Sequence, residues 1–182
     1  MSHLKVLTRE EVSTKNQGIF DNLEKAVGFV PNIYAAMANS ENALANYLPF
    51  SSAKTSFTNK EKEVIDLAVS EVNNCRYCQS AHTAIAKMNG FNNDQIIEFR
   101  KGGSTTSEKY NVLAQTAVAV VENRGKINTE QIESFFAAGY TKENLVDLIL
   151  AIASITVTNY FHNVSDVAID FPLAPELEPV NA

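Results

Sequence analysis

From Thr8 to Phe171 the chain divides into segments that each carry a helix start signal, an apolar repeat and a stop signal. Thr8-Arg9-Glu10-Glu11 and Thr58-Asn59-Lys60-Glu61 have the spacing of a capping box. Glycines follow several periodic segments, at the position where helices commonly end. No segment shows the period-two alternation of a strand, and the β-branched run 154–158 continues a helical pattern. The sequence therefore predicts an all-α protein.

These signals predict helix boundaries along the whole chain. A first helix is expected from Thr8 to about Ala26, a second after Pro31, and a third capped by Ser40 and ended or kinked by Pro49. The remaining helices are expected over 59–72, 75–89, 93–101, 107–124, 129–138 and from 141 onward. The segment after Thr141 is apolar nearly all round, so we expect it to be central.

Composition and charge restrict the class of protein. The chain has 182 residues, which suits one domain, and we assign residues 1–171 to it. Residues 172–182 contain three prolines and two glutamates and are expected to form an extended tail. A net charge of −6 argues against nucleic-acid binding. No run of 18 apolar residues occurs, and the start Met1–Lys5 lacks the apolar core of a signal peptide, so no membrane segment and a cytoplasmic location are expected.

A weak internal repeat relates two parts of the chain. Residues 58–82 and 141–165 both begin with a threonine cap and both contain a Leu-Ala pair. The two segments align with an offset of about 83 residues. Either a duplicated helical hairpin or chance similarity would explain this alignment. In the second copy Val146, Thr158 and Phe161 replace Glu63, Cys75 and Cys78. Any chemistry would therefore be confined to the first copy.

The stretch Cys75-Arg76-Tyr77-Cys78-Gln79-Ser80-Ala81-His82 holds both cysteines of the chain. Positions 75, 78 and 82 share one face of a helix, near a start whose free N–H groups and dipole favour a thiolate. A cysteine with a pKa of 8.5 is only about 3% thiolate at pH 7, but a pKa near 6.5 would make it about three quarters thiolate. His82 could strengthen this shift if protonated, or accept the thiol proton if neutral. Glu63, on the preceding helix, could orient that imidazole if the two helices pack side by side.

Several interpretations of this cluster compete. A structural disulfide between Cys75 and Cys78 would close a very small loop and would need an oxidising compartment. A zinc site could use both cysteines and His82, with Glu63 or another subunit as fourth ligand. The cysteines could also be buried hydrophobes, although the polar neighbours Arg76 and Gln79 suggest partial exposure. A redox centre is favoured over these alternatives.

Residues outside this cluster give weaker evidence of a functional site. His3 lies in a terminus expected to fray, and His162 lies on an apolar helix, where a hydrogen-bonded core or interface histidine is expected. Glu61 belongs to the capping box, so Glu63 is the spare carboxylate. No glycine-rich phosphate loop occurs, and no bound cofactor is expected.

The set Glu63, Cys75, Cys78 and His82 resembles the signature of the AhpD-like alkylhydroperoxidase family, within the carboxymuconolactone decarboxylase superfamily. The resemblance extends to residues 30–34, 158–163 and 169–172, and the last of these also fits the peroxidase-related members of the family. It implies an all-helical, homo-oligomeric protein that reduces hydroperoxides and is recharged by a thiol protein or small thiol.

The resemblance also implies the roles of the site residues. Cys78 would attack the peroxide, Cys75 would resolve the sulfenic acid, and Glu63 and His82 would relay protons, whereas position on the helix alone would favour Cys75 as nucleophile. Tyr77 stands where the best-studied members carry a histidine, and a tyrosine with a pKa near 10 is a poor proton shuttle. A non-redox decarboxylase-like enzyme or a helical binding protein on the same scaffold is the alternative.

Overall fold

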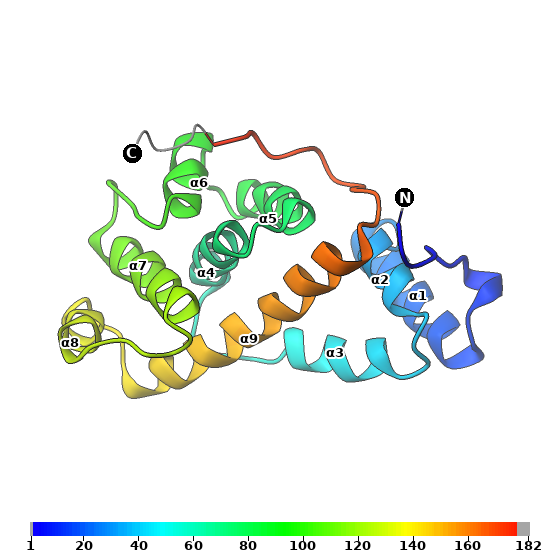
Figure 1. Ribbon diagram of the computed structural model, residues 1–182, viewed down its shortest axis with the longest axis horizontal. Coiled ribbons are helices and arrows are strands. Elements are labelled where there is room, and N and C mark those ends of the chain that lie inside the picture. The colour runs from blue at the N-terminus through cyan, green and yellow to red at the C-terminus, as the bar shows by residue number, and fades with distance from the viewer. Residues whose placement is uncertain (1, 178–182) are drawn as a thin grey trace.

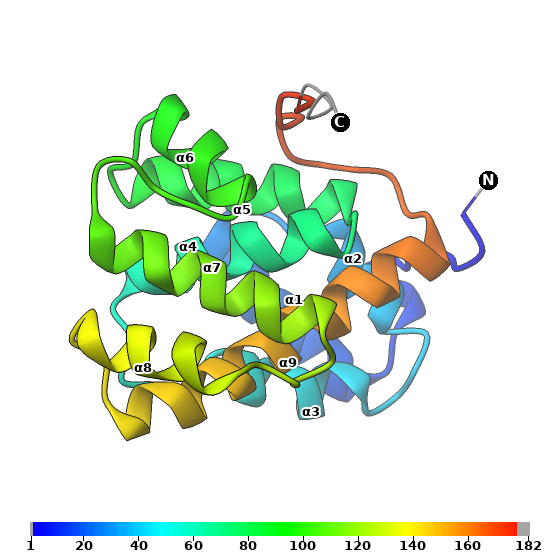
Figure 2. The same ribbon diagram turned by 60° about the vertical axis from the view of Figure 1, so that its left-hand side comes forward.

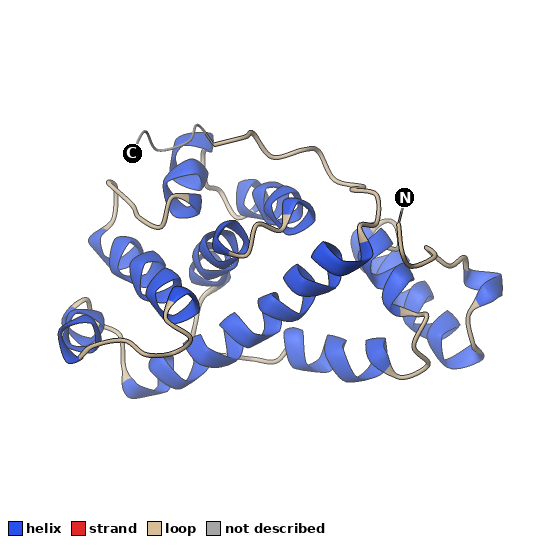
Figure 3. Ribbon diagram, in the orientation of Figure 1, coloured by secondary structure: helices blue, strands red, loops and turns tan. Residues whose placement is uncertain are grey.

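The computed structural model describes residues 2–177, and within that range the chain is helical and contains no strand (Figures 1 and 3). A short 3-10 helix, Arg9–Glu11, precedes the α-helices. Their bounds are α1 Thr14–Val27, α2 Asn32–Met37, α3 Ala43–Ser51, α4 Asn59–Val72, α5 Arg76–Met88, α6 Asn93–Arg100, α7 Glu108–Glu122, α8 Thr129–Ala137 and α9 Lys142–Ser165. The predicted all-α class is therefore confirmed.

Helix α4 is the centre of the packing. It contacts α5, α6, α7 and α9, which surround it in Figures 1 and 2. Its apolar residues Val64, Ile65, Leu67, Ala68 and Val69 are fully buried. The predicted capping box is present, since Thr58 accepts from the Glu61 N–H while the Glu61 carboxylate accepts from the Thr58 N–H. The start of α4 is therefore fixed locally, and its buried stripe fixes its orientation.

A tight turn between α4 and α5 sets the position of the cysteines. Asn74 adopts a left-handed conformation with φ of 51°, which asparagine tolerates better than most residues, and this ends α4. The Cys75 N–H donates to the Ser70 carbonyl at 3.0 Å, so the chain reverses at once into α5. The two helices consequently run side by side, and residues far apart in sequence face each other across them.

The segment after α9 runs past α5 and reaches α6 (Figure 1). Ala174 is buried, and its N–H donates to the Ser80 hydroxyl at 3.1 Å. Arg76 donates to the Ala174 carbonyl at 2.5 Å, and Arg100 donates to that of Pro175 at 2.7 Å. Residues 172–177 are thus extended and bonded to the helices, while the remaining residues of the expected tail, 178–182, lie outside the described range.

Two predicted helix starts in the first third of the chain are wrong. The helix expected from Thr8 divides at Val12, where Ser13 caps α1, because the Thr8 capping box organises only one 3-10 turn. Asn42, rather than Ser40, is the N-cap of α3. Pro49 lies inside α3, which continues to Ser51, so the helix does not end at the proline.

Helix α9 is less central than its composition predicted. It packs on α2, α3, α4, α5 and α7, yet one side of it is exposed. The exposed apolar residues on it are Val146, Ile149, Leu150, Val157, Tyr160 and Val164, which we call the α9 stripe. Among the described residues α9 is also the one helix long and apolar enough to cross a membrane by length and composition, a test that core helices pass too.

The proposed hairpin duplication is not seen in the structure. Residues 58–82 form two helices with a turn between them, whereas residues 142–165 form one continuous helix. The offset places Val157 opposite Asn74, and a β-branched residue strongly disfavours the left-handed conformation that makes the turn. The second segment therefore continues as a helix where the first one breaks.

Candidate functional site

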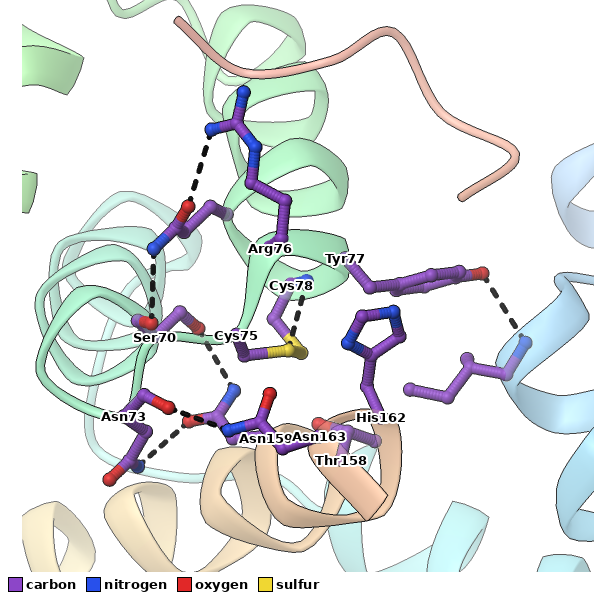
Figure 4. Close-up of a disulfide and its surroundings, with 12 residues drawn as sticks. Ser70, Asn73, Cys75, Arg76, Tyr77, Cys78, Thr158, Asn159, His162 and Asn163 are labelled. Atoms are coloured by element: carbon purple, nitrogen blue, oxygen red, sulfur yellow. Dashed lines mark hydrogen bonds between the residues drawn. A yellow bond between two sulfur atoms is a disulfide. The ribbon is translucent and has the colours of Figure 1, made fainter. Parts of the chain in front are cut away.

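A disulfide joins Cys75 and Cys78 at the start of α5 (Figure 4). Cys75 is the N-cap residue, and its sulfur accepts a hydrogen bond from the Cys78 N–H at 3.2 Å. The three-residue separation on the first turn brings the two Cα atoms to 5.3 Å, within the usual range for a disulfide. The cysteine pair is thus held where the helix N–H groups favour negative charge on sulfur once the disulfide is reduced.

The expected partial exposure of the cysteines is wrong. Cys75 is 0% and Cys78 is 2% exposed, and Gln79 is also buried. The polar residues of this helix start are held by the protein instead of by solvent: Arg76 bonds to the C-terminal segment, and the Gln79 amide donates to the Ser70 carbonyl at 3.5 Å. Access to the sulfur atoms is therefore restricted.

The route to the sulfur atoms is an apolar pocket of about 520 Å³. Cys78 and His82 both line it, whereas Cys75 does not. Its other walls come from the α1–α2 region, α5, α9 and the C-terminal segment, and include Phe29, Ile33, Tyr34, Ile85 and Phe171. A molecule in this pocket would meet Cys78 first, in surroundings with little water.

Two carboxylates from α4 form a cluster with His82. The His82 Nδ1 atom is 3.0 Å from a Glu63 carboxylate oxygen and 3.5 Å from one of Asp66. The side chains of His82 and Asp66 are 18% and 20% exposed, and that of Glu63 is 8% exposed. This confirms the inference that α4 and α5 pack with Glu63 against His82.

The cluster changes the protonation of its members. Burial alone would lower the pKa of His82, but Glu63 and Asp66 outweigh it and raise that pKa to about 9. Burial, reinforced by the negative charge of Glu63 and opposed by His82, raises the pKa of Asp66 well above its ordinary value. His82 is therefore an imidazolium at pH 7, so it favours a neighbouring thiolate by its charge and can donate a proton.

Tyr77 has a structural position and bonds to residues outside the carboxylate cluster. Its hydroxyl donates to Asp170 at 2.6 Å and accepts from the Ile33 N–H at 3.4 Å. Burial, with the Asp170 carboxylate next to it, raises the pKa of Tyr77 far above its ordinary value. Tyr77 therefore stays protonated at neutral pH and ties α5 to α2 and to the C-terminal segment.

Polar residues of α9 hold the turn before the cysteines. The Asn159 amide donates to the Ser70 hydroxyl at 3.1 Å, and the Asn73 amide donates to Asn159 at 2.9 Å. Asn163 donates to the Asn73 carbonyl at 2.7 Å (Figure 4). The turn geometry is consequently fixed from a helix distant in sequence.

The two remaining histidines differ in their surroundings. His162 lies beside the disulfide in Figure 4. It is 7% exposed, and its Nε2–H donates to the Val167 carbonyl at 3.2 Å, which confirms the prediction of a hydrogen-bonded core histidine. The side chain of His3 is exposed, and its backbone N–H donates to the Ser165 carbonyl at 2.9 Å, so this part of the terminus is tied to the end of α9.

The four residues singled out from the sequence thus fall into one region, with Cys75 and Cys78 in a disulfide and Glu63 paired with His82. Asp66 was missed. Its spacing of three from Glu63 places both carboxylates on one face of α4, and that was the available signal.

Cation ligation would use a different set from the one considered from the sequence. The donor atoms of Glu63, Asp66 and His82 lie within 4.8 Å of one another, and this set contains neither cysteine. Two carboxylates and one imidazole resemble a hard-cation set more than the sulfur-rich set of structural zinc. The 3.0 Å contact of His82 with Glu63 also suits a direct hydrogen bond, which needs no cation.

Comparison with known proteins places the chain among relatives of the same architecture. The model of the carboxymuconolactone decarboxylase family matches residues 31–120. A peroxidase-related protein of Ralstonia eutropha JMP134, described as an alkylhydroperoxidase AhpD core, superposes with a TM-score of 0.84 at 19% identity, over 93% of this chain and 92% of that one.

Two further solved structures have the same fold. A peroxidase-related protein of Silicibacter sp. TM1040 has a TM-score of 0.78 at 17% identity, over 91% of this chain and 89% of that one. The debrominase Bmp8, in a cysteine-to-alanine variant bound to 2,3,4-tribromopyrrole, has a TM-score of 0.77 at 18% identity, over 93% of this chain and 92% of that one. The curated proteins yielded no match. Residues 31–120 thus match the carboxymuconolactone decarboxylase family, and the chain has the AhpD-like helical fold of these neighbours.

Proposed function

We propose that the protein is a thiol-dependent hydroperoxide reductase that acts in antioxidant defence through Cys78 and Cys75. The Cys78 thiolate attacks the terminal peroxide oxygen, the O–O bond breaks, and the alcohol leaves with a proton while Cys78 becomes a sulfenic acid. Cys75 then displaces water from that sulfur to form the disulfide. A thiol protein or small thiol supplies the two electrons that regenerate both thiols.

One observation carries the proposal: Cys78 and His82 line the same apolar pocket, and Glu63 stands directly behind His82. A protonated His82 favours the thiolate and can give a proton to the departing alkoxide. The raised pKa of His82 supports this assignment of roles. The apolar walls suit organic hydroperoxides better than hydrogen peroxide.

The order of attack follows from access. Cys78 borders the pocket and Cys75 does not, so Cys78 is the peroxide-attacking residue in this proposal and Cys75 the resolving one. This arrangement outweighs the closeness of Cys75 to the helix start.

The test is peroxide consumption by the reduced protein. With cumene hydroperoxide and dithiothreitol, Cys78→Ser should lose turnover. Cys75→Ser that has been reduced and then freed of dithiothreitol should consume one equivalent of peroxide and accumulate a dimedone-reactive sulfenic acid on Cys78. Equal consumption by wild type and Cys78→Ser would refute the proposal.

A second candidate is reductive dehalogenation at the same thiols. The pocket is lined by Phe29, Tyr34 and Phe171, which suits a flat apolar ring, and a debrominase shares the fold. The two thiols would supply two electrons and become the disulfide, while the carbon–bromine bond is replaced by carbon–hydrogen. Bromide release from 2,3,4-tribromopyrrole, matched by disulfide formation, would favour this candidate over the first.

We further propose that the protein forms homo-oligomers through the α9 stripe. The stripe residues 146, 150, 157, 160 and 164 follow a helical spacing around the small residue Ala153, which permits close antiparallel pairing with a second copy. Val157→Glu should shift sedimentation toward the monomer, whereas Met88→Glu, at an exposed apolar residue elsewhere, should not. A monomeric wild type would exclude this interface.

The need for a thiol reductant leads us to propose a cytoplasmic, reducing location. Fractionation of cells producing the tagged protein tests it, and recovery in an oxidising compartment would contradict it.

A further inference from the structure

His162 is a buried imidazole that the proposed peroxide chemistry leaves without a role. It projects from α9 toward the start of α5, and its ring centroid lies 5.3 Å from that of Tyr77. Figure 4 shows the ring facing the disulfide, with one nitrogen on the side of the sulfur atoms. The position on α9, remote in sequence from the cysteines, explains why sequence spacing does not reveal it.

The hydrogen bonds of His162 fix which nitrogen can accept a proton. Nε2 donates to the Val167 carbonyl, so Nε2 carries the hydrogen and Nδ1 has a free lone pair. Nδ1 is buried and has no hydrogen-bond partner of good geometry among residues 2–177, since the nearby Asn163 amide donates to the Asn73 carbonyl instead. Burial also lowers the pKa of His162, so its ring is neutral at pH 7. A buried acceptor without a donor is costly and therefore points to a partner present in another state of the protein.

Reduction of the disulfide supplies such a partner. A disulfide has no hydrogen to donate, whereas the reduced pair offers two S–H groups in the same place. Imidazolium His82 favours the thiolate of Cys78 on the pocket side, which leaves Cys75 as the thiol that keeps its hydrogen. Tyr77 cannot accept this hydrogen in place of His162, since its hydroxyl is engaged by Asp170 and Ile33.

We propose that Nδ1 of His162 accepts the hydrogen of the reduced Cys75 thiol and takes its proton when Cys75 closes the disulfide. This rests on the proposed function for its place in a catalytic cycle, but the hydrogen bond itself requires only the reduced pair. In the closing step the Cys75 sulfur bonds to the Cys78 sulfur, and the S–O bond of the sulfenic acid breaks. The Cys75 proton goes to His162. His82, which has regained a proton from solvent after the peroxide step, protonates the departing hydroxide, and water leaves.

Two imidazoles in opposite protonation states would thus serve two thiols. His82 beside the carboxylates is cationic, and His162 in the apolar core is neutral, which is the pattern expected when a site needs both a proton donor and a proton acceptor.

Two substitutions separate the functions of the two ring nitrogens. His162→Gln keeps a donor at the distance of Nε2 for the Val167 carbonyl and removes the acceptor at Nδ1. His162→Asn places an amide oxygen near Nδ1 and gives up the bond to Val167. Both remove the imidazole and leave a polar side chain, so a purely structural role predicts similar effects from both.

The measurement is the equilibrium between the cysteine pair and a dithiothreitol redox buffer at pH 7, which requires no peroxide. His162→Gln should favour the disulfide by about three- to tenfold, the range expected for one lost hydrogen bond in the reduced state. His162→Asn should stay within about twofold of wild type on the same reasoning. In wild type, the 15N resonance of Nδ1 should also move on reduction, as expected when an acceptor gains a hydrogen bond.

Equal redox equilibria in wild type and His162→Gln, or an Nδ1 resonance unchanged by reduction, would overturn the inference. These results are independent of hydroperoxide turnover. A shift in His162→Gln together with absent peroxidase activity would reject the proposed function alone, and normal peroxidase activity with no shift would reject the role of His162 alone.

Discussion

The Glu63→Gln substitution tests the charge on which the site depends. Glu63 and Asp66 together hold the pKa of His82 at about 9, against an ordinary value of 6.5. At about 1.4 kcal/mol per pKa unit, this corresponds to roughly 3 kcal/mol of preference for the imidazolium. Glu63 is the closer carboxylate, at 3.0 Å against 3.5 Å for Asp66, so we expect it to supply more than half of that preference. The pKa of His82 should therefore fall by about one to two units in Glu63→Gln.

The assay is a histidine-ring NMR titration of the 15N-labelled protein. The chain has three histidines, and a His82→Gln sample identifies the resonance. Glu61→Gln is the matched control, because Glu61 lies on the same helix with a side chain of similar burial, 7% exposed against 8% for Glu63, but pairs with Lys109. The control should leave the pKa of His82 within about 0.3 units, since Glu61 makes no contact with it.

Reactivity of Cys78 should follow the pKa of His82. With less imidazolium at pH 7, the iodoacetamide alkylation rate of reduced Cys78 should fall in Glu63→Gln and stay normal in Glu61→Gln. A wild-type pKa for His82 at or below its ordinary value, or the same pKa in Glu63→Gln as in wild type, would refute the electrostatic reasoning.

Three further predictions concern Asp66, Tyr77 and the pH dependence of stability. Asp66→Asn should lower the pKa of His82 less than Glu63→Gln does, because its contact is longer; an equal or larger drop in the NMR titration would contradict this. Tyr77→Phe removes a buried hydroxyl and leaves Asp170 without that donor, so the free energy of unfolding in urea should fall by about 1–3 kcal/mol, with Cys78 alkylation unchanged. Unfolding should also depend on pH. The pKa of His82 is raised on folding, so its stabilisation is complete below the ordinary value of 6.5 and is lost as pH rises through about 9. The decrease should be about 1–3 kcal/mol and should be reduced in His82→Gln.

The sequence was informative about the fold because its helix signals are local. The Thr58 capping box and Gly90 with φ of 85° mark boundaries that the structure confirms within a residue or two. The errors arose where tertiary packing decided the outcome. The Thr8 box starts only a 3-10 turn, and α9 exposes a stripe although its composition predicted a central helix.

The candidate site also combines features that the sequence predicted with features that depend on tertiary packing. The set Glu63, Cys75, Cys78 and His82 was accessible from spacing, and the structure confirms the contact between its carboxylate and its imidazole. The exposure of the cysteines could not be predicted, because the C-terminal segment, almost a hundred positions later, bonds to Arg76 and Ser80 and its Phe171 lines the pocket beside Cys78.

The amino-acid sequence by itself thus determined the helical class, the turn at Asn74 and the placing of two thiols and an imidazole on one helix face, since each depends on residues within a few positions of one another. Only the tertiary structure decided which groups those residues meet. It pairs His82 with Asp66 as well as Glu63, directs Tyr77 to Asp170, and sets His162 beside the disulfide. The physical reason is that pKa values and accessibility depend on charges and surfaces brought together by packing, which local spacing does not specify.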